Sequence, residues 1–292
     1  MDQVEKNRVF TMLAVGITAL SFAGILIKLS TAPPLIIAFY RMAISSLILT
    51  PIFLLKYRKE FNYVLDYRMI IAGFLLAIHF FLWISAFEYT KVANAVIFVS
   101  LQPLFTLILE FLFAREDLRK GVVLGIVLAL LGGIIISFGD SSRLFEQLRG
   151  DLLALAAAFF AGLYLFIGRG LRKEVKYFPY IYLVYGYCTV FLGILVLISG
   201  LPPVGYPPVN YLLFLGMAIG PTLLGHSSIN YAVRYIPVTL VSLLLLGEPI
   251  LTTVLARIIL GEKITVVTIV GGILILVGVY QAMNRKQRQF NN

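Results

Sequence analysis

The chain has 292 residues, of which 60% are hydrophobic and 13% are charged, and its mean hydropathy is +0.96. Soluble domains carry about a quarter charged residues, so this composition excludes an ordinary soluble protein and predicts an integral membrane protein. The net charge of +10 would suit a nucleic acid partner, but the distribution of the basic residues favours membrane orientation, and no nucleic acid is expected. The single cysteine, Cys188, excludes an intrachain disulfide.

Ten stretches of the chain are long and apolar enough to cross a bilayer, since a spanning helix needs about 20 mostly apolar residues. The first follows Lys6 and Arg8, but no A-x-A cleavage pattern comes after it. We therefore interpret it as an uncleaved span and not as a signal peptide. The expected spans are 9–29, 34–55, 69–88, 93–113, 120–138, 151–170, 178–199, 210–232, 239–260 and 264–283.

The lysines and arginines between these spans predict an orientation. Seventeen of the 24 fall on the side of the N-terminus, and four fall on the other side: Lys91, Arg143, Arg149 and Lys263. Cytoplasmic loops of membrane proteins are enriched in Lys and Arg. The bias therefore predicts a multi-pass protein of the cell (inner or cytoplasmic) membrane with both termini in the cytoplasm.

Two stretches of the chain resemble each other at an offset of 146 residues, VANAVIFVSLQPLFTLILEFLFAREDL at 92–118 and VTLVSLLLLGEPILTTVLARIILGEKI at 238–264. Pro103 aligns with Pro249, and Gln102 aligns with Glu248. Self-similarity at a fixed offset indicates a duplicated structural unit. Each unit has five spans, an odd number, so the second enters the bilayer upside down relative to the first.

These observations predict an all-α integral membrane fold with ten transmembrane helices in two inverted five-helix repeats. The expected boundaries are 1–140 for the first repeat, 150–285 for the second and 286–292 for a cytoplasmic tail. Inverted repeats place a pseudo-two-fold axis in the membrane plane, and substrate sites then lie between the repeats near mid-depth. This arrangement favours a transporter whose halves open alternately to the two sides.

The motifs that are missing narrow the function further. There is no G-x-x-x-x-G-K-[ST] run, so this chain is not expected to use ATP. There is no H-E-x-x-H motif, and the two histidines, His79 and His226, are far apart in the chain, which predicts no metal site. We expect no cofactor and no catalytic residues.

Three stretches carry a resemblance to a known family: FAGILIKLSTAPPLIIAFYRMAISSLIL, VSLQPLFTLILEFLFARED and LGEPILTTVLARIILGEKIT. The sequence resembles the drug/metabolite transporter superfamily, in particular its EamA-type ten-helix transporters, over nearly its whole length. The resemblance implies efflux of metabolites or amino acids across a bacterial or archaeal inner membrane. It also implies that spans five and ten lie at the edge where relatives form dimers; a homodimer of this chain stays an open hypothesis. The first span reads SFAG where many members carry a tryptophan–glycine pair.

Glu248 is a carboxylate near the middle of the ninth span, where a charge costs about 2.5–3.5 kcal/mol on insertion scales. It is a candidate for proton coupling or for binding a substrate amine. The alternative is a structural carboxylate that binds backbone groups freed by the adjacent proline. Pro103 and Pro249 each remove one helical hydrogen bond, and they are either a symmetric pair of hinges or packing kinks.

The remaining candidates are polar and aromatic residues inside the spans. His79 and Trp83 are four residues apart on one helix face, as are His226 and Asn230 on another, so we expect each pair to line a central cavity formed by spans 1, 3, 4, 6, 8 and 9. Interhelical hydrogen bonding is the alternative. The predicted substrate-binding set is His79, Trp83, Gln102, Tyr164, His226, Asn230 and Glu248. Arg41, inside span two, is expected to be a framework residue, with anion binding as the alternative.

The leading interpretation is a secondary transporter that exports amino acids or related small metabolites by alternating access. Its partners would be a small net-neutral or zwitterionic substrate and the lipid bilayer, with proton coupling as a further hypothesis. One alternative is an intramembrane enzyme with Glu248 and His79 as acid and base. Another is a structural membrane subunit, which would enclose no polar cavity.

Overall fold

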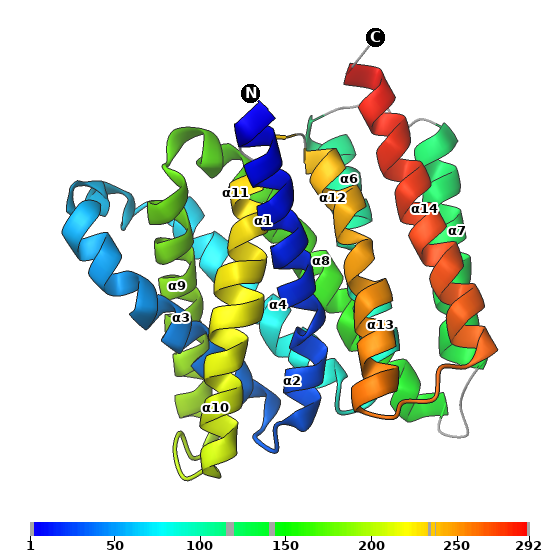
Figure 1. Cartoon of the computed structure of the whole chain (residues 1–292), viewed down its shortest axis with the longest axis horizontal. Helices are drawn as coiled ribbons and strands as arrows, with labels where there is room; N and C mark the ends of the chain where they lie inside the picture. The colour runs from blue at the N-terminus through cyan, green and yellow to red at the C-terminus, as the bar shows by residue number, and fades with distance from the viewer. Residues whose placement is uncertain (1–2, 115–119, 140–143, 233–234, 237, 291–292) are drawn as a thin grey trace.

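The computed structural model describes residues 3–114, 120–139, 144–232, 235–236 and 238–290, and within these residues it is built of helices and connecting turns without strands. Figure 1 shows the helices side by side in one bundle. In chain order they are α1 Gln3–Ser21, α2 Ala23–Leu29, α3 Pro34–Lys56, η1 Arg58–Tyr63, α4 Tyr67–Ala86, α5 Val92–Val99, α6 Gln102–Ala114, α7 Lys120–Gly139, α8 Leu144–Glu174, α9 Tyr177–Ser199, α10 Pro208–Met217, η2 Ala218–His226, α11 Ser227–Ala232, α12 Val238–Leu245, α13 Gly247–Ile259 and α14 Val266–Phe290.

The predicted spans are present as helices. Nine stretches in the described part of the chain are long and apolar enough to cross a membrane. The remaining expected span, the ninth at 239–260, is formed by α12 and α13, which meet at Leu246. Both α1 and α14 have their terminal ends at the top of Figure 1, as an even number of crossings requires. The all-α membrane fold predicted from the sequence is confirmed.

The helix packing has the reciprocal pattern of an inverted duplication. In the first half, α4 packs along α8 of the second half; in exchange, η2 and α11 of the second half pack along α1 of the first. The second spans of the two halves, α3 and α9, pack on each other, as do α5 and α13. Exchanging the two halves maps the packing of α4 on α8 onto the packing of η2 and α11 on α1, and it maps the contact of α3 with α9 onto itself. The centre of the molecule is the place where both halves contribute equivalent helices.

The two halves approach each other closely where α7 and α14 cross. A Cβ on Gly125 would lie 2.5 Å from the carbonyl oxygen of Gly278, and one on Gly132 would collide with the carbonyl oxygen of Gly271. At the repeat offset Gly125 corresponds to Gly271, and Gly132 corresponds to Gly278. Each glycine thus contacts the counterpart of the other, which is the relation that a two-fold axis produces. Only glycine permits this approach of two backbones.

Two ion pairs join the halves at the end of the molecule that holds the termini. Arg68 Nη2 lies 2.7 Å from Glu174 Oε2, and Lys176 Nζ lies 2.7 Å from Glu60 Oε1. Arg68 also pairs with Asp66, the residue that caps the start of α4. The hydrogen bonds from Arg68 lower the pKa of both Asp66 and Glu174 below the usual carboxyl range, and the bond from Lys176 to Glu60 raises the pKa of Lys176.

These shifts predict how stability responds to acid. Because the pKa of Glu174 is lower in the folded than in the unfolded protein, the carboxylate stabilises the fold above the unfolded value of about 4.3 and loses this effect as the pH falls through the folded pKa. We expect Glu174→Gln to give a small fall in Tm at pH 7 that disappears as the pH is lowered below about 4. Thermal melts in detergent from pH 7 to pH 3 measure it. Glu88→Gln, an exposed residue at the opposite end, is the control; the same pH dependence in both variants would contradict the assignment.

Candidate substrate cavity

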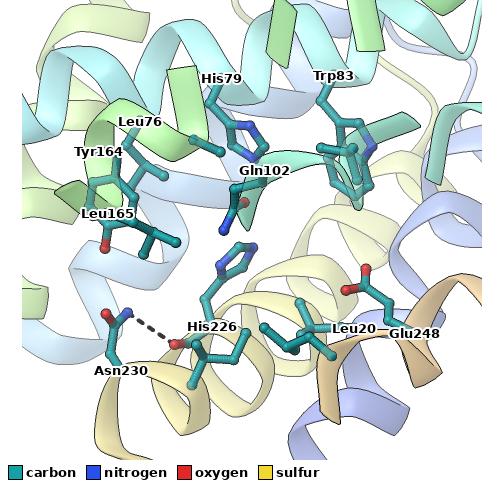
Figure 2. A pocket seen from close by; sticks show the side chains of 14 residues that line it. Leu20, Leu76, His79, Trp83, Gln102, Tyr164, Leu165, His226, Asn230 and Glu248 are labelled. Atoms are coloured by element: carbon teal, nitrogen blue, oxygen red, sulfur yellow. Dashed lines mark hydrogen bonds between the residues drawn. The ribbon is translucent and has the colours of Figure 1, made fainter. Parts of the chain in front are cut away.

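A cavity lies at the centre of the bundle, where six spans meet. It has a volume of about 80 Å³, which is room for a few water molecules. Its walls come from α1, α4, the α5–α6 pair, α8, the η2–α11 pair and the α12–α13 pair. All seven residues of the predicted substrate-binding set line it, and Figure 2 shows their side chains converging: His79, Trp83, Gln102, Tyr164, His226, Asn230 and Glu248.

The rest of the wall is apolar. It consists of Leu20, Leu76, Val99, Ala161, Leu165, Ile229 and Leu245. A few convergent polar groups on a mostly apolar surface are typical of small-molecule sites. The arrangement can hold a small molecule that has both a polar end and an apolar end. A structural subunit without an enclosed polar cavity, one of the alternatives, does not fit this observation.

The α4 wall is made by His79 and Trp83, whose rings are nearly parallel at a centroid distance of 6.1 Å. His79 Nδ1 lies 2.9 Å from the carbonyl oxygen of Ala157 on α8. A carbonyl only accepts hydrogen bonds, so Nδ1 carries a proton, and in the neutral ring Nε2 is left as an acceptor. This contact fixes the imidazole against α8. His79 and Glu248 line the same cavity, without a hydrogen bond between their side chains.

The opposite wall is made by His226 and Asn230. Asn230 Nδ2 donates to the carbonyl oxygen of His226 at 3.0 Å, the bond drawn in Figure 2. Its Oδ1 accepts from Arg172 Nη1 at 3.2 Å, a partner that the sequence did not suggest. The His226 ring meets Phe80 of α4 edge to face at 5.4 Å. The two inverted-related helices thus touch across the cavity.

Gln102 and Glu248 occupy equivalent places at the beginnings of two half-helices. Gln102 is the first residue of α6, and Glu248 is the second residue of α13. In Figure 2 Gln102 lies between the two histidine rings, and the carboxylate of Glu248 points toward Trp83. A carboxylate in the first turn of a helix is stabilised by the helix dipole. The duplication therefore presents an amide on one side of the cavity and a carboxylate on the other.

The fourth and ninth spans are each interrupted just before the half-helix that carries Gln102 or Glu248. The fourth span breaks at Ser100 and Leu101, and the ninth breaks at Leu246. Pro103 and Pro249 follow the breaks directly, and both cannot donate a backbone hydrogen bond. The residues before the breaks, Val99 and Leu245, line the cavity. The predicted hinge role is consistent with this geometry and stays a prediction.

Arg41 lies behind the α4 wall and is fully buried. Its Nε donates to Thr222 Oγ1 at 2.7 Å. Thr222 belongs to η2, a π-helical segment with Pro221 inside it, and π-helical turns occur frequently at functional sites. The sequence predicted a framework role for Arg41 but did not single out Thr222, for which the proline in the middle of the expected span 210–232 was the available signal.

A polar network that the sequence did not reveal lies toward the end opposite the termini. Asp151 of α8 is 2% exposed and accepts hydrogen bonds from Thr90 Oγ1 and Ser137 Oγ, each at 2.8 Å. Asn94 continues the network to Thr268 of α14 at 3.3 Å. It ties together the spans around that end, whereas the cavity extends toward the terminal end as far as Asn230, two residues before the end of α11.

Comparison with known proteins decides the family. The sequence pattern of the EamA-like transporter family matches this chain twice, at residues 8–138 and 148–283. The chain belongs to the EamA-like transporter family. The two matched segments are the two inverted halves of the fold, so the duplication seen in the packing is also a duplication of the family unit. The resemblance to the drug/metabolite transporter superfamily noted in the sequence is confirmed.

Relatives of this EamA-like transporter match it over most of its length. An uncharacterized transporter of Archaeoglobus fulgidus is 26% identical, and the match covers 96% of this chain and 100% of the relative. The uncharacterized transporter YdfC of Bacillus subtilis is 25% identical, with 95% and 92% covered. A crystal structure that is 20% identical has the same fold, with a TM-score of 0.66 and coverage of 93% and 97%.

Proposed function

We propose that this EamA-like transporter is a secondary transporter that exports amino acids or related small zwitterionic metabolites by alternating access. The observation that carries the proposal is the cavity between the inverted halves. Its apolar wall suits the side chain of a substrate, and its polar groups include hydrogen-bond donors and acceptors. The substrate-binding role of its seven polar residues is part of the proposal. A phosphorylated substrate would require two or more lysines or arginines at the same depth, and the described residues that line the cavity include neither.

The orientation follows from the basic loops. With both termini in the cytoplasm of a cell with this protein in its inner membrane, the cavity lies near mid-depth and the Asp151 network lies toward the outer side. Glu248 is the one carboxylate in the wall, which makes it the candidate for coupling substrate movement to protons.

Counterflow in proteoliposomes tests the proposal. Purified protein is reconstituted in vesicles loaded with unlabelled leucine, and uptake of labelled leucine is followed with and without a pH gradient. Exchange above that of protein-free vesicles, and its stimulation by the gradient, are the expected results. A panel of amino acids, nucleosides and sugars run in parallel would show a different cargo, and transport restricted to nucleosides or sugars would overturn the substrate class.

The hinge role of the prolines makes a separate prediction. Pro249→Ala restores a backbone N–H and allows α12 and α13 to continue as one helix. We expect the maximal transport rate to fall several-fold, with KM nearly unchanged, because the rearrangement and not the binding is impaired. Pro208→Ala is the matched control, since Pro208 is the first residue of α10, where proline interrupts no helix. An unchanged rate in Pro249→Ala would identify the break as a packing feature.

A further inference from the structure

Three buried hydrogen-bond donors beside the cavity have no acceptor among the described residues. They are Arg41 Nη1, Arg41 Nη2 and the indole Nε1 of Trp83. Arg41 is 0% exposed and Trp83 is 4% exposed. Buried polar groups in native proteins are nearly always paired, and an unpaired charged donor is especially costly. These three donors are therefore available to an acceptor that enters this part of the molecule.

The geometry around Arg41 leaves one edge of its guanidinium free. Thr222 Oγ1 takes the Nε proton and fixes the plane of the group. Arg41 Cζ lies 4.4 Å from the centre of the Phe80 ring and 5.8 Å from that of Trp83. The two aromatic side chains form a wall between the guanidinium and the cavity, which Trp83 lines directly. A movement of Trp83 would join the free edge of Arg41 to the cavity.

The chemistry of a suitable acceptor follows from the donors. A planar fork of two guanidinium nitrogens matches the two oxygens of a carboxylate, and the indole N–H adds a third donor. In Figure 2 the carboxylate of Glu248 points toward Trp83 within the cavity, and it supplies the opposite charge. The site therefore has a cation at one end and an anion at the other, across Trp83.

We propose that Arg41, together with the indole N–H of Trp83, forms the subsite that binds the carboxylate of the substrate, while Glu248 binds its amine. This assignment rests on the proposed transport function and refines it. The carboxylate reaches Arg41 as the Trp83 side chain swings from the wall. Arg41 changes accordingly from the framework residue expected from the sequence to a specificity-determining one.

Trp83 provides the measurement, because it is the single tryptophan of the chain. Protein in nanodiscs is titrated with leucine, leucinamide and 4-methylpentanoate, and Trp83 fluorescence is followed. The amide removes the carboxylate, and the acid removes the amine. We expect the wild type to bind leucine at least about tenfold more tightly than either analogue, since sites built for a polar group reject ligands that lack it.

The variants separate the two ends of the site. In Arg41→Gln the preference for leucine over leucinamide should vanish, while the preference over 4-methylpentanoate stays. In Glu248→Gln the pattern should be reversed. Arg41→Lys keeps the charge without the fork, and should restore part of the first preference. Should Arg41→Gln fail to fold, Thr222→Val leaves the guanidinium in place, releases its fixed plane and should reduce the same preference alone.

The outcomes distinguish this inference from the proposed function. Full discrimination between leucine and leucinamide in folded Arg41→Gln would show that Arg41 is structural, while the transport proposal would stand. Binding of 4-methylpentanoate alone, lost in Arg41→Gln, would keep the carboxylate subsite and overturn the zwitterionic substrate. If Arg41 instead pairs with Glu248 in the absence of substrate, Arg41→Gln would release Glu248 and bind leucinamide more tightly than the wild type does. That result would contradict the carboxylate subsite. No response to any of the three ligands would overturn both proposals.

Discussion

Replacing Glu248 by glutamine is expected to reduce proton-driven transport by about tenfold or more, the largest functional effect of any single change in the cavity. The amide keeps the size of the side chain but cannot carry a proton or a charge at this depth, where charges are costly and are retained for function. Flux driven by the substrate gradient alone should persist at a reduced level and no longer respond to pH. Proteoliposome uptake with an imposed pH gradient measures both quantities.

The duplication offers a matched variant. Gln102 occupies the place of Glu248 in the other half, so the double change Gln102→Glu with Glu248→Gln moves the carboxylate to the equivalent half-helix. The two positions face one cavity, and we expect the exchange to recover part of the pH response that Glu248→Gln loses. Full gradient-driven flux in Glu248→Gln alone would show that the coupling role is wrong.

Replacing Gly132 by alanine is expected to give the largest loss of stability. Its Cβ would collide with the carbonyl oxygen of Gly271, and this neighbour is backbone that cannot rotate away. Overpacking of a tight contact costs about 1–3 kcal/mol, which for a chain of this size lowers Tm by roughly 2–5 °C. Loss of monodisperse protein on heating in detergent, followed by size-exclusion chromatography, measures the shift.

Gly186→Ala is the control for this measurement. Gly186 also lies inside a helix, but a Cβ there meets nothing within 4 Å. Alanine is favoured over glycine in a helix by about 1 kcal/mol, so this variant should melt at the same temperature as wild type or slightly above it. Equal melting of the Gly132 and Gly186 variants would mean that α7 and α14 do not approach as closely as described.

The features that sequence predicted well are those that repeat or alternate along the chain. Apolar length fixed the number of spans, and the offset between Pro103 and Pro249 pointed to two inverted halves. Once the halves were inverted, residues at the middle of the spans had to converge, which is why His79, His226 and Glu248 could be placed at one cavity without coordinates.

The features that sequence missed depend on partners that are remote in the chain. Arg41 is held by Thr222, 181 positions away. Thr222 lies in a π-helix that contains Pro221, and no local sequence pattern predicts that π-helix. Asp151 accepts a hydrogen bond from Thr90, which is 61 positions away in the chain. Such pairs become visible only when the helices are packed, because the hydrogen bonds of a polar side chain within a span depend on its neighbours and not on its own helix.

The chemical difference between Gln102 and Glu248 bears on the relative energies of the two open forms of the proposed transport cycle. A molecule assembled from two identical halves would find its two open forms equal in energy, and would favour neither side of the bilayer. At this pair one half carries a carboxylate and the other an amide, so under the proposed mechanism the protonation of Glu248 would change the relative energies of the two open forms. The gradients of substrate and protons would then set the direction of net flux.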